Sequence, residues 1–96
     1  MSPYQVQLKL SVQITKQGRR FITWTPALDL STSGRSGAEA KKRFAEAVQI
    51  FIEELIEAGT VDEVLRGLGW TKSQQSWMPP RVIKEQTLSV TVPAMA

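Results

Sequence analysis

The feature that most constrains the fold is an unbroken alternation of apolar and polar residues near the N-terminus. It runs over residues 4–15, from Tyr4 to Thr15. Because successive side chains of a strand point to opposite faces of a sheet, this pattern predicts a half-buried antiparallel strand. Gly18 follows at the place where a tight turn needs a positive φ, and strand-forming residues then occupy positions 20–25. We therefore predict that the chain begins with a β-hairpin.

A third strand and a long helix are predicted next. Pro26 interrupts strand pairing, and the alternation resumes over residues 28–32. Ser36 and Glu39 have the spacing of a capping box, and Gly59 has the usual place of a helix-ending glycine, so the helix should run to about Ala58. Apolar residues recur along it at three- and four-residue spacing, which indicates a face that packs on the sheet. They are Ala40, Phe44, Ala47, Val48, Phe51 and Leu55.

The C-terminal part predicts a second helix and a last strand. Thr60 and Glu63 repeat the capping-box spacing, and Gly69 should end this short helix. Residues 70–78 could be extended, Pro79 and Pro80 break regular structure, and residues 87–92 alternate again. The predicted fold is α+β, an antiparallel sheet in the order β-β-β-α-α-β with one long helix packed on one face. We expect a single domain over residues 1–96, with a core of residues 1–69 and an extended segment of residues 70–96.

Composition argues against catalysis. The chain has no cysteine and no histidine, which removes the thiolate nucleophile, the disulfide, the base of a Ser-His-Asp triad and the commonest metal ligand. We predict a protein that is not an enzyme and holds no cofactor or metal. The N-terminus lacks a charged stretch followed by an apolar run, and no apolar stretch approaches the roughly 20 residues that cross a bilayer. We expect a cytoplasmic protein that does not contact membranes.

Two clusters could carry chemistry but have simpler explanations. Glu53, Glu54 and Glu57 could supply paired carboxylates, yet they occupy or adjoin the polar face of the predicted helix and are better interpreted as solvated. The hydroxyl- and glycine-rich residues 31–37 lead into a helix N-terminus, where a phosphate could bind. Their spacing matches neither common phosphate-binding motif, and helix capping explains them.

Basic residues form the strongest candidate binding site. They gather at the predicted hairpin tip and around the start of the long helix, where positive charge opposes the helix dipole. This conflict suggests an electrostatic partner, either an acidic protein surface or a nucleic acid, and the alternative is a solvated charged face. Trp77 could lie at an interface as well. The candidate contacts for a partner or RNA are Lys16, Arg19, Arg20, Arg35, Lys41, Lys42 and Trp77, with Arg43 beside them.

Apolar residues outside the sheet-facing stripe suggest an oligomer. Ile52 and Ile56 lie on the helix flank, where either the second helix or another subunit could cover them. Leu88, Val90 and Val92 form one face of the predicted last strand, which is either a member of the sheet or an edge that pairs with another chain. These five residues are the candidate oligomer interface.

Short motifs in residues 26–55 resemble those of a known family. The motifs are Pro26-Ala27-Leu28-Asp29-Leu30, Ser33-Gly34, Ala38-Glu39-Ala40, Phe44, Ala47-Val48 and residues 51–55. With this spacing, roughly the first 60 residues resemble the HicB-like antitoxins. The resemblance implies a partly degenerate double-stranded-RNA-binding fold and a homo-oligomer, a dimer or tetramer. It also implies a toxin–antitoxin system in which the protein neutralises a small, mRNA-cleaving, HicA-like toxin by covering its active site.

The chain departs from this family after Gly69. Antitoxins of the family that repress their own operon carry a C-terminal DNA-binding module, and the segment after Gly69 is too short for one. We therefore expect a short form that does not bind DNA sequence-specifically, either an antitoxin or a solitary relative with another partner. The alternative is an RNA-binding protein that uses the basic residues of the hairpin tip and the helix start.

Overall fold

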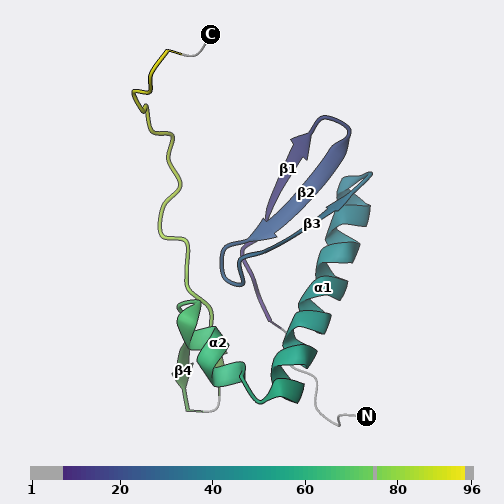
Figure 1. Ribbon diagram of the computed structural model, residues 1–96, viewed down its shortest axis with the longest axis vertical. Helices are drawn as coiled ribbons and strands as arrows, with labels where there is room; N and C mark the ends of the chain where they lie inside the picture. The colour runs from purple at the N-terminus through teal and green to yellow at the C-terminus, as the bar shows by residue number, and fades with distance from the viewer. Residues whose placement is uncertain (1–7, 75, 95–96) are drawn as a thin grey trace.

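A three-stranded antiparallel sheet, a long helix, a short helix and a small two-stranded sheet follow one another along the chain (Figure 1). The structure is a computed structural model that describes residues 8–74 and 76–94. Its elements are β1 (Gln13–Gln17), β2 (Arg20–Thr25), β3 (Leu30–Gly34), α1 (Gly37–Ala58), α2 (Val61–Gly67), β4 (Thr71–Ser73) and β5 (Ser76–Met78). The α+β class is confirmed, and α1 packs against β2 and β3 as predicted for one face of the sheet.

The first hairpin has the predicted turn. Gly18 has a φ of 61°, a conformation that glycine adopts without steric cost, and Gln17 pairs with Arg20 on either side of the turn. The second strand has the predicted bounds. The two strands stay in register up to the pair of Gln13 with Trp24.

The first strand is shorter than predicted and begins later. Residues 4–7 of the predicted strand lie outside the described residues, and residues 8–12 are not in a strand. The ladder ends because β2 ends at Thr25, and Pro26 has no backbone N–H to continue it. Thr25 instead donates its side-chain hydroxyl to the carbonyl of Ser11 at 2.9 Å. Leu8 and Leu10 leave the sheet and pack against the core.

The third strand lies two residues further along than predicted. A turn over residues 26–29 replaces its expected start, with the amide of Asp29 donating to the carbonyl of Pro26 at 3.3 Å. Asp29 has a φ of 49°, which aspartate tolerates better than most residues, so it belongs to a turn and not to a strand. The turn sends Ala27 and Leu28 into the core.

The long helix begins and ends as predicted. The Ser36 side chain accepts the Glu39 amide at 3.1 Å, and Gly59 ends the helix in the left-handed conformation. The capping prediction for the second helix is wrong. Thr60 precedes α2 with a φ of −114° and a ψ of 16°, and it makes no side-chain capping bond.

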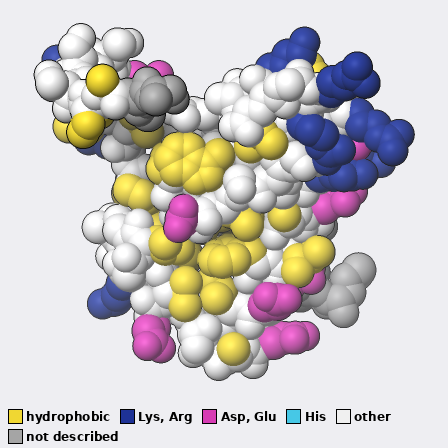
Figure 2. Space-filling model, turned by 45° about the horizontal axis from the view of Figure 1, so that its top comes forward, with side chains coloured by type: hydrophobic (Ala, Val, Ile, Leu, Met, Phe, Trp, Pro, Cys, Tyr) yellow, Lys and Arg dark blue, Asp and Glu magenta, His cyan; other side chains and the backbone are white. Residues whose placement is uncertain are grey.

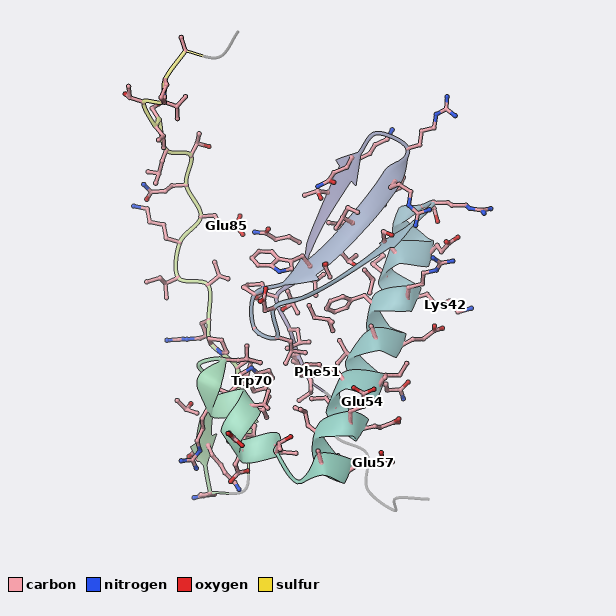
Figure 3. The ribbon with its side chains drawn as sticks, viewed as in Figure 1. Lys42, Phe51, Glu54, Glu57, Trp70 and Glu85 are labelled. Carbon is pink, nitrogen blue, oxygen red and sulfur yellow. The ribbon has the colours of Figure 1, made fainter. Side chains whose placement is uncertain are left out.

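The core lies between the turn after β2, the helices and the segment after α2. Ala27, Leu28, Leu65 and Trp70 are its buried centre. Partly buried apolar residues from α1, including Phe51, pack around them (Figure 3). The segments that meet here are far apart in the sequence, so the core closes only when the sheet and both helices are in place.

The predicted last strand is absent from the described residues. After β5, residues 79–94 have no regular secondary structure and run past the sheet and away from it (Figure 1). The radius of gyration is 16.5 Å, whereas a compact chain of this length has about 12.5 Å. Alternation alone does not make a strand, because the backbone also needs a neighbour to pair with. We call residues 79–94 the C-terminal arm.

Candidate binding surfaces

Strand register brings the hairpin tip and the start of α1 to the same end of the molecule. Phe21 pairs with Lys16 on one side and with Gly34 on the other, and Arg35 follows Gly34 directly. Arg20 Nη2 donates a 2.8 Å hydrogen bond to the Ser33 hydroxyl, close to the end of β3. Basic residues separated by many positions in the sequence are therefore neighbours in space.

This basic end holds seven exposed cations, and most of the Lys and Arg side chains in the view gather there (Figure 2). They are Lys16, Arg19, Arg20, Arg35, Lys41, Lys42 and Arg43. The acidic residue among them is Glu39, which forms an ion pair with Arg43 at 3.1 Å. The structure thus brings together all of the basic candidates from the sequence and leaves a large excess of positive charge at one end.

The cations of the basic end point in several directions. Lys16 lies on the helix side of the sheet, with Nζ 5.7 Å from the centroid of the Phe21 ring. Arg20 is bound to Ser33 on the opposite, uncovered face. Lys42 points away from the sheet (Figure 3). Such an arrangement attracts a polyanion from several sides and suits contacts with a phosphate backbone better than reading of single bases.

An acidic row runs along α1 from its middle to its C-terminal end. Glu46, Glu53 and Glu57 recur at helical spacing, and all three are exposed. Glu57 lies near the C-terminal end of α1, whereas Lys42 lies toward its N-terminal end (Figure 3). The prediction that the carboxylates at positions 53, 54 and 57 are solvated is confirmed by their exposure.

An apolar row runs beside the acidic row on the same helix. It consists of Ala45, Ile52 and Ile56. Ile52 is half-buried, but Ile56 remains 63% exposed, so α2 does not cover it. An apolar strip with charged residues along its rim has the make-up of a protein–protein interface.

Trp77 does not lie with the basic end. It sits in β5, opposite Lys72 of β4, and packs half-buried against the core. Two cations lie near its ring, Lys72 Nζ at 5.5 Å and Arg66 Cζ at 5.8 Å from the centroid. These cation–π contacts hold Trp77 in its own hairpin. Sequence reasoning missed them because Arg66 comes from α2.

The C-terminal arm passes the start of β1. Gln13 Nε2 donates a 3.2 Å hydrogen bond to Glu85 Oε1, and residues 11–13 and 82–85 line an open groove of about 330 Å³ together with Pro26. Beyond this point Leu88, Val90 and Val92 are exposed. Glu85 was not a candidate from the sequence, since nothing in its local pattern indicates a contact 72 positions away.

Within residues 8–74 and 76–94, no group of three acidic, histidine or cysteine side chains is placed to hold a metal ion. No helix in the described part of the chain is long and apolar enough to cross a membrane. Comparisons of the chain with protein-family models, with curated proteins and with solved structures find no match.

Proposed function

We propose that this protein is a non-catalytic, cytoplasmic binding module of the HicB-like antitoxin type, which neutralises a small mRNA-cleaving toxin by direct contact. The observation that carries the proposal is the pair of rows on α1, the apolar residues Ala45, Ile52 and Ile56 beside the acidic residues Glu46, Glu53 and Glu57. The order of three antiparallel strands followed by a long helix agrees with the fold that the resemblance implies.

Charge explains why these rows would suit such a toxin. An enzyme that cleaves RNA binds a phosphate backbone, and surfaces that do so are rich in lysine and arginine. A protein that covers this surface needs an acidic rim to match the positive charge and an apolar centre to exclude water. Residues 45–57 of α1 provide both side by side, and of the six residues in the two rows all but the half-buried Ile52 are exposed.

The test measures binding between the purified protein and the small gene product encoded beside it, by calorimetry. In the double variant Glu53→Lys and Glu57→Lys the acidic row becomes basic, and we expect affinity to fall at least about tenfold because like charges then face each other. The matched control is Lys41→Glu with Lys42→Glu, which reverses two charges at the other end of the same helix and should leave binding unchanged. Equal binding by both double variants, or no binding by the wild-type protein, contradicts the proposal.

A second candidate function is RNA binding at the basic end. The seven exposed cations there favour it, because neutralising phosphates releases counterions and gives affinity without a deep pocket. The same two double variants test RNA binding with their roles exchanged, so that the lysine variant is the test and the glutamate variant is the control. The measurement is fluorescence anisotropy with a labelled RNA across a salt series. Lys41→Glu with Lys42→Glu should weaken binding and reduce the salt slope by about 2, at about 1 for each lost phosphate contact. An affinity that does not fall as salt rises contradicts RNA binding.

A further inference from the structure

The C-terminal arm contains a strand-like sequence that no other described residue covers. Leu88, Val90 and Val92 alternate with threonine and serine, and they are 68%, 74% and 60% exposed. Residues of this type are favoured in strands, and leaving three of them together in water is unfavourable. The arm therefore has the composition of a sheet strand without its pairing.

The outer edge of β1 is not paired with any described strand, so it could accept one. The strand order is β1-β2-β3, so β1 has β2 on one side and no described strand on the other. Every residue of β1 is exposed, because α1 packs against β2 and β3. Val12 and Ile14 lie on the helix side of this edge, and Ile14 is 47% exposed. An edge of this kind is a template for another strand.

The arm approaches this edge but does not pair with it in its own molecule. The bond from Gln13 to Glu85 brings the arm to the start of β1, and the arm then turns away from the sheet (Figure 1, Figure 3). The apolar residues follow only after Glu85. The apolar residues of the arm therefore extend away from the folded core, starting close to the first residue of β1, whose outer edge could bind a strand.

Charge favours a second copy of this chain as the partner. Residues 86–94 contain no charged side chain, and Lys16 is the charged residue of β1. This last part of the arm therefore has no charge with which to complement a basic toxin or a nucleic acid. Its uncharged strand residues fit an almost uncharged edge, and each copy of the chain carries both.

We propose that residues 87–92 of one copy add as a strand to the outer edge of β1 in a second copy, and that the exchange is reciprocal. Backbone hydrogen bonds continue the sheet, and Leu88, Val90 and Val92 cover Val12 and Ile14 on the helix side. A two-fold axis relates the two contacts, so both edges and both arms are used and the assembly closes as a dimer. This dimer does not depend on a toxin or on RNA.

The test is the mass of the purified full-length protein in solution, by light scattering over a range of concentrations. The wild-type chain should be a dimer. Val90→Asp places a charge on the buried side of the added strand, and Ser89→Pro removes a backbone donor from it, so both variants should be monomers at concentrations where the wild type is not. Ser89→Asp adds the same charge on the opposite, solvent-facing side and should remain a dimer.

Far-UV circular dichroism controls for folding. Because residues 87–92 lie outside the core, all three variants should keep the helical signal of the wild-type protein and unfold cooperatively. A wild-type protein that is a monomer at all concentrations overturns the proposal. So does a dimer that survives both Val90→Asp and Ser89→Pro, because another surface must then hold it. Since the measurement uses the protein alone, its failure is distinct from a failure of the toxin or RNA proposals.

Discussion

The indole nitrogen of Trp70 donates a 2.7 Å hydrogen bond to the carbonyl of Ala27, and both residues are buried. Ala27 lies in the turn between β2 and β3, and Trp70 follows α2, so one bond ties the last part of the folded core to the first sheet. Leu28 and Leu65 pack around the pair. The position of the segment after α2 relative to the turn between β2 and β3 depends on this contact.

Replacing Trp70 should therefore destabilise the whole protein. Trp70→Phe keeps an aromatic ring but removes the donor and leaves the Ala27 carbonyl without this partner, in a buried place. We expect the free energy of unfolding to fall by about 1–3 kcal/mol, with a further loss from the space that the smaller ring leaves. Urea denaturation followed by circular dichroism measures it. Trp24→Phe, at a half-buried position, serves as control, and an equal loss in both variants would assign the effect to ring size and not to the hydrogen bond.

A second close contact joins the sheet to α1 at Gly34. A Cβ placed on Gly34 would lie 2.6 Å from the backbone nitrogen of Ala40, a separation that real Cβ atoms do not reach. Glycine is required here by the approach of the helix backbone and not by a positive φ. Gly34→Ala should cost about 1–3 kcal/mol of unfolding free energy, as overpacking of a tight site does.

Gly37→Ala is the matched control for this prediction. An added Cβ at Gly37 meets no atom within 4 Å, and the residue is the first of α1, where alanine is tolerated. We expect a change of less than about 1 kcal/mol, in the stabilising direction, because alanine has less backbone freedom to lose on folding. Thermal unfolding of Gly34→Ala and Gly37→Ala under the same conditions measures the difference in stability between them. A Gly34→Ala protein as stable as the wild type would mean that β3 and α1 can move apart.

Two hydroxyls, of the buried Thr23 and the half-buried Thr32, connect the same helix to the sheet. The hydroxyls of Thr23 and Thr32 lie 2.8 Å apart, and each lies 3.2 Å from the carbonyl of Ala40. When either threonine is replaced by valine, the remaining hydroxyl can still donate to Ala40. We therefore expect the double variant Thr23→Val with Thr32→Val to lose more stability than the sum of the single variants, by at least about 0.5 kcal/mol. Additive losses in a urea-denaturation cycle would show that the two hydroxyls act separately.

Local signals in the sequence were sufficient where the structure they specify is itself local. Gly18, Ser36 and Gly59 each act within a few residues, and the hairpin turn and both ends of α1 lie where the sequence predicts them. The first and third strands were misplaced because their bounds depend on a partner. Pro26 ends the pairing available to β1, and the turn at Asp29 delays β3.

The binding surfaces show the same difference between features that local sequence predicts and features that depend on distant segments. The basic residues were found as two groups in the sequence, but only the register of β1 with β2 and of β2 with β3 places them at one end. The contact of Gln13 with Glu85 and the cations around Trp77 join distant segments, and no local pattern indicates them. For residues 87–92, alternation predicts a strand that the described residues do not form, because alternation cannot say which backbone would supply the hydrogen bonds.

The two predicted capping boxes provide a last comparison, because they look alike in the sequence and differ in the structure. Ser36 accepts the Glu39 amide, whereas Thr60 makes no side-chain capping bond. Ser36→Ala should therefore lower the free energy of unfolding by about 1 kcal/mol, and Thr60→Ala should change it by no more than a few tenths of that. Urea denaturation of both variants measures the difference. Equal losses would mean that Thr60 also caps its helix in solution, and that the sequence pattern was correct at both sites.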